Sequence, residues 1–405
     1  MYIVKTKEDN RQVFNNVYGK NNENALDLSG NLYMDINALI LSAEEHEEIL
    51  EAQGDVVKLF EDMQRIIRLK PELLEWLGIP EILWDDVIKE SISNLTSYGR
   101  FDWMFDKEGI LQLLEFNSET PFGWKEAIDY HERLHSYYRD YRNLNGCIKE
   151  LLPISVYKSL REQGFHVCDR IGIIGDLMDK EEIDTYDVLQ RVIGYECEEV
   201  LVDSIMNLKA MDNQVFIERG DSLYPIDFLQ TFYSCEWMAY DEGGADFVSA
   251  LRSGSLKLIN PTSTLILHSK GLFALIWYLY SEEAMLKVHG DTIENYIPYT
   301  TFIEDEFKDS QKFVAKPLNH REGSGVEIRH RITGIEDESL IYQEYVDSCE
   351  IEYPISNGSF SRRDEMLKPT IGTYLINNEF GGYFTRLSKE VCSSNFSVFV
   401  PTFIK

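Results

Sequence analysis

The chain has few cysteines and few basic residues for its 405 positions, and each scarcity excludes a class of protein. The six cysteines lie far apart, without a C-x-x-C pair, which argues against a structural zinc site, a redox centre and a disulfide framework. Lys and Arg number 39 against 70 Asp and Glu, giving a net charge of −31. Nucleic-acid binding is therefore not expected, because it depends on clustered basic residues.

Long apolar runs are missing as well. The longest candidate, residues 265–279, is interrupted by His268, Ser269 and Lys270, whereas a membrane-spanning helix needs about 20 apolar residues. The first residues, MYIVKTKEDNRQVF, contain neither the apolar core of a signal peptide nor an Arg-rich targeting pattern. We therefore expect a cytoplasmic protein without a membrane partner. Its acidic excess is typical of a solvated surface, although a cationic substrate would also fit.

With 44% hydrophobic residues, the chain can bury a large core divided among several lobes. Helical periodicity over residues 35–99 predicts a helical start, and a hairpin follows it, with further helix at 125–163. Beyond residue 165, strand, helix and strand predict a βαβ unit, and the last third alternates strands with a Gly-rich loop typical of a nucleotide lid. The predicted regions are 1–95, 96–165, 166–258 and 259–405.

The most informative segment is RFDWMFDKEGILQLLEFNSETPFGWKE, residues 100–126. Its two apolar-alternating runs carry Asp102, Glu115 and Asn117 and are separated by a turn at residues 106–109. On neighbouring strands of a hairpin, these oxygen ligands would converge at one end of a sheet and form a magnesium site beside a phosphate. The alternative is an ordinary hairpin with a charged face towards solvent.

Three cationic side chains late in the chain fit a phosphate ligand. Lys316 ends a predicted strand and precedes the loop NHREGSG, whose small residues allow backbone N–H groups to approach phosphate oxygens. Lys270 stands at the start of a predicted helix. Arg386 follows two glycines on a strand, where its planar guanidinium could hold two oxygens of a transferring group. The alternatives are an ordinary hairpin loop and a surface arginine.

Residues 131–135 read His-Glu-Arg-Leu-His, which is the H-E-x-x-H spacing of many zinc peptidases. On a helix, His131 and His135 would share one face, with Glu132 as the base. The flanking sequence is polar and aromatic, and no recognisable motif supplies a third ligand. A zinc metallopeptidase therefore stays as an alternative function.

Two neighbouring acids, Glu181 and Glu182, follow the predicted strand that ends in Gly175-Asp176. Ligands of α/β sheets bind at the carboxyl ends of strands, so these carboxylates could hold an amine or a hydroxyl group. The alternative is a solvated helix N-terminus, where the helix dipole favours acids.

Taken in order, these segments resemble the ATP-grasp synthetase of the glutathionylspermidine synthase family, without the amidase domain of its bifunctional members. The resemblance implies an α/β ATP-grasp fold, circularly permuted, with a helical N-terminal lobe, a small preATP-grasp-like α/β lobe at 166–258, and a lid and C-terminal base at 259–405. Residues 96–165 would contribute to the base. The matching strings, over about residues 95–405, are RFDW, LLEFNSETPFGWKEA, EEIDT, YSCEWMAYD, INPTSTLILHSKG, FVAKPLNHREGSGVEI, IYQEYVD, IGTYLINNEFGGYFTR and NFSVFVP.

The resemblance also implies an ADP-forming ligase that uses ATP and Mg²⁺ to phosphorylate a carboxylate, which an amine then attacks to form an amide. The implied substrates are small molecules, namely a carboxylate such as a small or thiol-containing peptide and an amine such as a polyamine. The implied site residues are Arg100 and Arg386 for catalysis; Asp102, Glu115 and Asn117 for magnesium; Lys270, Lys316, Glu322, Gly323, Gly325, Gln343, Glu344 and Tyr345 for ATP; and Glu181, Glu182, Thr120 and Glu126 for the substrates.

The sequence departs from the family pattern where the substrates are expected to bind. Ser234-Cys235 stands where related sequences have Pro-Trp, and the REGSG loop is followed by Val326-Glu327 and a short lid. These differences predict a reshaped acceptor wall but leave ATP and metal use intact. A non-catalytic ATP-binding relative is a further alternative, although the retained charged residues argue against it.

Overall fold

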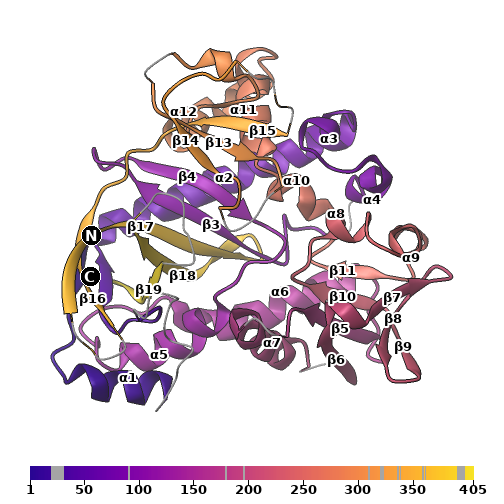
Figure 1. Cartoon of the computed structure of the whole chain (residues 1–405), viewed down its shortest axis with the longest axis horizontal. Coiled ribbons are helices and arrows are strands. Elements are labelled where there is room, and N and C mark those ends of the chain that lie inside the picture. Colours follow the sequence, from indigo (N-terminus) through magenta and orange to yellow (C-terminus); the bar gives the residue numbers. More distant parts are fainter. Residues whose placement is uncertain are drawn as a thin grey trace.

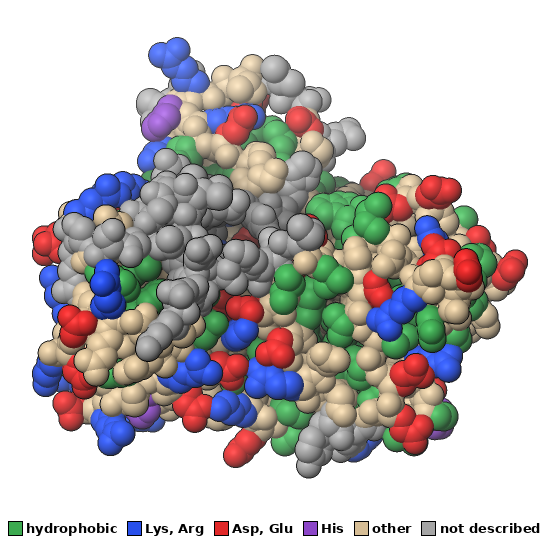
Figure 2. Space-filling model, turned by 60° about the horizontal axis from the view of Figure 1, so that its bottom comes forward, with side chains coloured by type: hydrophobic (Ala, Val, Ile, Leu, Met, Phe, Trp, Pro, Cys, Tyr) green, Lys and Arg blue, Asp and Glu red, His purple; other side chains and the backbone are tan. Residues whose placement is uncertain are grey.

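The computed structural model describes residues 1–19, 32–89, 92–177, 180–194, 197–308, 311–319, 323–334, 337, 339–357, 360, 362–389 and 397–405, with the backbone alone at positions 180, 181 and 362. Within these ranges, no helix combines the length and apolar character needed to cross a membrane. On the face drawn in Figure 2, acidic and basic side chains are interspersed along the lower part of the molecule, as expected for a solvated surface.

An antiparallel sheet with the order β19-β18-β17-β3-β4 occupies the middle of the molecule, and β16 pairs with β17 (Figure 1). The long strand β17 is the link, because it pairs with β16 through its first half and with β3 through its second half. The bounds are β3 (Tyr98–Phe105), β4 (Leu111–Asn117), β16 (Ile351–Ser356), β17 (Arg362–Ile376), β18 (Glu379–Ser388) and β19 (Val398–Val400).

Helix α2 (Ala43–Leu69) covers one face of this sheet (Figure 1). A capping box at Ser42 fixes its start, and the ring of Phe60 lies 6.0 Å from Phe101 and 5.7 Å from Phe116 of the sheet. Side chains alternate between the two faces of a strand, so the neighbours of Phe101 on β3, Arg100 and Asp102, face the opposite side. The core under α2 thus orients the charged residues of β3 towards the other face.

A parallel sheet with the order β11-β10-β5-β6 forms a separate α/β lobe, at the right of Figure 1. Strand β5, helix α7 and strand β6 form the predicted βαβ unit, and an antiparallel sheet with the order β7-β8-β9 adjoins it. The bounds are β5 (Arg170–Gly175), α7 (Lys180–Ile193), β6 (Glu199–Ser204), β7 (Leu208–Met211), β8 (Gln214–Arg219), β9 (Ser222–Ile226), β10 (Phe228–Thr231), α8 (Cys235–Met238), α9 (Gly244–Ser253) and β11 (Lys257–Ile259).

A small antiparallel sheet with the order β12-β15-β13-β14 forms a lid above the central sheet (Figure 1). It packs on helix α11, which begins directly after Lys270. The strand that was predicted to end at Lys316 is confirmed as β13. The bounds are α10 (Leu265–His268), α11 (Gly271–Ser281), α12 (Gly290–Tyr296), β12 (Thr300–Thr301), β13 (Phe313–Pro317), β14 (Glu327–Arg329) and β15 (Leu340–Glu344).

The two chain ends meet in a third small sheet, β1-β2-β20, which corrects the prediction for the first region. Helix was expected from residue 35, but residues 38–41 form β2, a fully buried strand that pairs in parallel with β20. A short apolar run does not distinguish strand from helix, and here the partner at the far end of the chain decides. The bounds are β1 (Tyr2–Val4), α1 (Asn10–Tyr18), β2 (Ala38–Leu41), α3 (Leu73–Trp76), α4 (Trp84–Val87) and β20 (Thr402–Ile404).

The helix predicted at 125–163 is also wrong as one continuous element. It consists of a π-helical turn at Glu126–Tyr130, the short helix α5 (His131–His135), an irregular stretch, and α6 (Ile148–Glu162). The interruption places residue 142 beside β20, where the backbones of Arg142 and Ile404 exchange hydrogen bonds of 2.8 and 3.1 Å. Tertiary pairing therefore overrides local periodicity at this point.

Candidate functional site

The hairpin of β3 and β4 is confirmed, and its register places the predicted metal ligands side by side. Asp102 stands directly opposite Glu115, and Arg100 stands opposite Asn117. The turn closes through a 2.9 Å hydrogen bond from the backbone N–H of Asp106 to the carbonyl of Ile110. Alternation along each strand keeps these four side chains on the sheet face away from α2.

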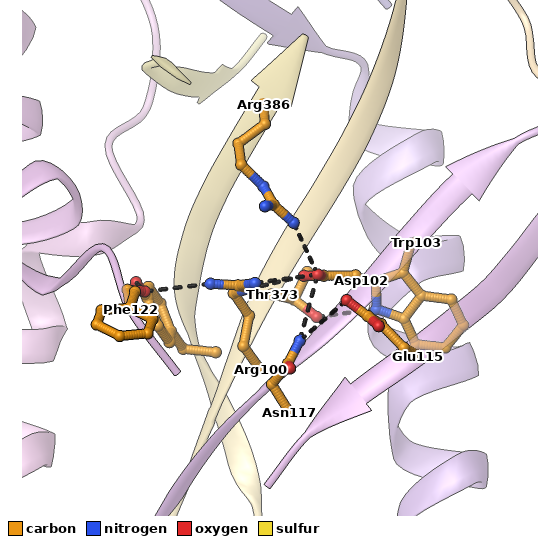
Figure 3. Close-up of polar contacts among 9 residues, drawn as sticks. Arg100, Asp102, Trp103, Glu115, Asn117, Phe122, Thr373 and Arg386 are labelled. Atoms are coloured by element: carbon orange, nitrogen blue, oxygen red, sulfur yellow. Dashed lines mark hydrogen bonds and ion pairs between the residues drawn. The ribbon is translucent and has the colours of Figure 1, made fainter. Parts of the chain in front are cut away.

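Asp102 is the centre of a buried network of charged side chains (Figure 3). Arg100 donates to both of its carboxylate oxygens, at 2.7 and 3.0 Å, and Arg386 of β18 donates at 2.9 Å. Asn117 donates more weakly to Asp102, at 3.3 Å, and to Glu115, at 3.4 Å. Burial alone would raise the pKa of Asp102, but the guanidinium groups of Arg100 and Arg386 hold it below its ordinary value. Asp102 is therefore ionised at neutral pH.

Two glycines and one ring shape the space around these guanidinium groups. A Cβ on Gly372 would lie 2.9 Å from Cδ of Arg100, and one on Gly123 would lie 2.2 Å from the ring of Phe384. The ring of Phe384 in turn lies 5.0 Å from the Arg100 guanidinium and 5.8 Å from that of Arg386. The close approach of backbone to side chain at both glycines therefore lets both arginines lie next to one aromatic ring.

Two lysines, one on the lid and one directly before α11, lie at the same face of the hairpin. Lys316, on β13, donates to the side chain of Gln343 at 2.6 Å and to the carbonyl of Leu114 at 3.4 Å. Lys270, which precedes α11, lies 3.9 Å from the carboxylate of Glu115. Cationic groups from distant parts of the sequence thus surround the two carboxylates of the hairpin.

Most of these charged residues line one open pocket with about 690 Å³ of empty space, between the central sheet and the lid. Arg100 and Asn117 are not among its described lining residues. Its polar wall contains Asp102, Glu115, Lys270, Lys316 and Arg386. Its apolar wall, which the sequence did not single out, contains Leu114, Val314, Val326, Ile328 and Val346. A concave site with convergent charges at one part and aliphatic side chains at another suits a small ligand that has both an anionic and an apolar portion.

A family model described as glutathionylspermidine synthase preATP-grasp matches residues 4–405. The chain belongs to this family. A Haemophilus influenzae protein with the provisional name acid–amine ligase is 25% identical over 320 residues, which cover 75% of this chain and 73% of that protein. A glutathione synthetase-like effector of Globodera pallida, solved in its apo form, shares the fold with a TM-score of 0.60 at 11% identity, covering 93% of this chain and 90% of that chain. The fold is thus of the ATP-grasp type.

The remaining residues that the resemblance assigns to ATP are divided between the pocket and its surroundings. Gly323, Gln343 and Glu344 line the pocket, and Gln343 is held by a 3.0 Å bond to Thr300. Tyr345 is not among the described lining residues, and its ring packs under Lys312. Gly325 adopts a left-handed conformation beside the pocket, with φ of +72°, and Glu322 lies outside the described residues.

The residues assigned to the substrates are not among the described lining residues of this pocket. Thr120 and Glu126 are buried, and the charge of Glu126 acts on Tyr374. The hydroxyl of Tyr374 and the guanidinium of Arg100 both donate hydrogen bonds to the carbonyl of Phe122.

Glu182 accepts hydrogen bonds from the backbone of Asp176, at 2.7 Å, and from the hydroxyl of Tyr186. The side chain of Glu181 is outside the described part of the chain.

The H-E-x-x-H residues are engaged in packing. Nε2 of His131 donates to the carbonyl of Thr402 at 2.9 Å, and Nε2 of His135 donates to that of Tyr141 at 3.0 Å. Glu132 points away and pairs with Lys149 at the surface. Among the described residues, no group of three or more His, Cys, Asp or Glu side chains could hold a metal ion. The arrangement does not favour the zinc-peptidase alternative.

Proposed function

We propose that the protein is an ATP- and magnesium-dependent ligase, which joins a carboxylate to an amine through an acylphosphate with release of ADP. One observation carries the proposal: two carboxylates of the β3–β4 hairpin and three cations from later in the chain line the same pocket. Family membership and the name of the Haemophilus influenzae relative support a ligase that joins acids to amines. In the sequence, the two acids of the pocket precede its lysines, and this order supports a circularly permuted ATP-grasp fold.

The nucleotide would lie between the lid and the central sheet. The aliphatic wall formed by Leu114, Val314 and Ile328 suits a purine base, while Gln343 and Glu344 offer hydrogen-bonding groups beside it. Lys270 and Lys316 would contact the phosphates as point charges. The lid contributes one lysine and most of the aliphatic wall, so its position relative to the sheet would control nucleotide binding.

The donor set of the hairpin fits a magnesium ion. Asp102 and Glu115 offer carboxylate oxygens from facing positions, and the amide of Asn117 lies within 3.4 Å of both carboxylates. Hard oxygen ligands of this kind, without nitrogen or sulfur, are what Mg²⁺ prefers. When bound, the ion would neutralise charge on the triphosphate. Asp102 and Glu115 would orient it, and the guanidinium groups of Arg100 and Arg386 keep Asp102 ionised.

The two arginines are suited to different parts of the reaction. Three donor groups of Arg100 are already used, two by Asp102 and one by the carbonyl of Phe122. Arg386 uses one donor for Asp102, and its Nε is buried without a partner among the described atoms. Arg386 would therefore stabilise the phosphoryl group in transfer, and Arg100 would mainly hold Asp102 and the acyl side of the site in place.

The substrates would approach from the α/β lobe. Glu126, next to Tyr374, and Glu182, at the carboxyl end of β5, would favour a cationic amine such as a polyamine. Thr120 would contact the acid, a small peptide or a thiol-containing peptide.

The test is an ADP-release screen with ATP and Mg²⁺, in which small and thiol-containing peptides are crossed with polyamines and amino acids and the new amide is detected by mass. We expect at least one pair to give equal amounts of ADP and amide. Lys316→Ala should lower both signals by about 10²–10³-fold, whereas Lys308→Ala, at an exposed lid lysine outside the pocket, should leave them unchanged. Unchanged turnover in Lys316→Ala would contradict the proposal.

A further inference from the structure

The strand β14 is the least supported part of the pocket wall. It has three residues, lies at the edge of the lid sheet, and pairs with β13 alone. Its Ile328 and the preceding Val326 nevertheless line the pocket. A short edge strand is marginal when it has only one neighbour, so something else must hold these two side chains against the ligand.

A buried carboxylate supplies this support from a different segment of the lid. Glu304, in a short 3-10 helix after β12, has a side chain that is only 4% exposed. One of its oxygens accepts a 2.8 Å bond from Arg329, the last residue of β14. The other accepts bonds from the backbone N–H and the hydroxyl of Thr333, at 2.8 and 2.6 Å, and from the N–H of Gly334 at 3.2 Å. Burial raises the pKa of Glu304, but the bonds from Thr333 and Arg329 outweigh burial and lower it.

Arg329 extends the contact along β14. It also pairs with Glu327 at the other end of the strand, at 2.9 and 3.0 Å, and its guanidinium lies 5.9 Å from the ring of Tyr342 on β15. The Glu304 carboxylate thus joins both the end of β14 and the turn that follows it to the segment after β12. Charge-assisted bonds of this kind are stronger than neutral ones, and four of them meet on one buried group.

We propose that Glu304 is a positioning residue for the nucleotide, because it clamps β14 so that Val326 and Ile328 stay against the base. The inference depends on the proposed nucleotide site but assigns Glu304 no contact with the ligand. It separates two parts of the lid: Lys316 and Gln343 meet the nucleotide directly, and the Glu304 clamp sets how well the apolar wall is preorganised for it. Preorganisation of this kind changes affinity more than it changes the chemical step.

The test compares Glu304→Gln with Asp305→Asn, an exposed acid at the next position. Binding of Mg-ATP to the full chain is measured by calorimetry, and KM for ATP and kcat are measured with the active substrate pair. In Glu304→Gln, we expect binding about tenfold weaker, KM raised by the same factor and kcat within about twofold, because a charge-assisted contact is lost outside the reacting centre. Asp305→Asn should match the wild type. Equal affinity in Glu304→Gln and the wild type would overturn the inference.

Two further measurements keep the result interpretable. Thr333→Ala removes one hydroxyl bond to Glu304, and we expect about threefold weaker binding in a protein that folds normally. Hydrogen exchange of residues 323–334 without nucleotide should be faster in Glu304→Gln than in the wild type, and unchanged exchange would contradict the clamp. If the wild type fails to bind Mg-ATP, the proposed function is wrong, whereas the exchange measurement still decides whether Glu304 holds β14.

Discussion

The central sheet and the lid contribute to the same pocket but are built in different ways. Arg100 and Asp102 of the sheet lie on the long strand β3, are 5% and 1% exposed, and pair with each other. The lid strands have two to five residues, and Lys316 is held by two hydrogen bonds at the pocket surface. Arg100 and Asp102 should therefore contribute to the stability of the fold, whereas Lys316 should contribute little to it. Substitutions in the two regions should separate activity from stability.

The largest effect is expected for Asp102→Asn. Loss of the charge leaves the buried guanidinium group of Arg100 and the partly exposed one of Arg386 without their carboxylate, so the free energy of unfolding should fall by about 3–5 kcal/mol. Activity should fall at least about 10³-fold, because the group that orients the metal is lost. Lys316→Ala should lower activity by about 10²–10³-fold but stability by less than about 1 kcal/mol. Urea unfolding and ADP release measure both quantities, and equal stability losses in the two variants would refute the contrast.

A second comparison lies within the sheet itself. Arg100→Ala removes three hydrogen bonds from a buried site, so we expect a loss of about 2–4 kcal/mol in stability along with activity. Arg386→Ala should reduce kcat by about 10²-fold and stability by only about 1 kcal/mol, since its side chain is partly exposed and Arg100 still neutralises Asp102. Arg386→Lys should recover only part of the rate, because the lysine ammonium keeps the positive charge but lacks the planar group that can hold two oxygens. If Arg386→Ala destabilised the protein as much as Arg100→Ala, both arginines would be structural.

The same contrast explains how much of the site was predictable from the sequence. Apolar alternation and a polar turn identify the β3–β4 hairpin, but a register shift between Asp102 and Trp103 places Asp102 opposite Glu115. An unbroken register from the turn would pair Asp102 with Leu114 instead. Local sequence does not predict that Lys270 and Lys316 lie beside this hairpin, because their position depends on packing between segments more than 150 residues apart. Only the family resemblance, with its motifs in order along the chain, predicted that they belong to the same site. Gly372 is likewise unremarkable in the sequence until β17 is placed beside Arg100.

The features that sequence reasoning missed are those that depend on distant partners. Residues 38–41 are apolar at every position, so only their pairing with β20 makes them a strand. Glu304 is the first acid of a Glu-Asp-Glu string that looks like exposed surface, and its burial depends on Arg329 and Thr333, 25 and 29 residues later. Where the structure relies on such pairings, composition and periodicity carry no information about them.

The smallest effect on activity is expected for His131→Gln, which lies outside both regions. Burial lowers the pKa of His131 to about 4, from an ordinary value near 6.5. Between about pH 4 and pH 6.5, His131 is therefore protonated in the unfolded chain and neutral in the folded chain. The stability contributed by neutral His131 is complete above about pH 6.5 and is lost as the pH falls towards 4. Between pH 7 and pH 5, the wild type should lose about 2 kcal/mol more than His131→Gln, which cannot titrate.

Urea unfolding at the two pH values measures this difference, and other groups that titrate in both proteins cancel from the comparison. The exposed His166→Gln should keep the pH dependence of the wild type. Activity at pH 7 should be retained in His131→Gln, and neither protein should contain zinc, because Nε2 of His131 is bonded to a backbone carbonyl. If His131→Gln lost both activity and bound zinc, the reacting centre would lie at α5. That result would contradict the proposed site between the lid and the β3–β4 hairpin, where Asp102 contacts Arg386.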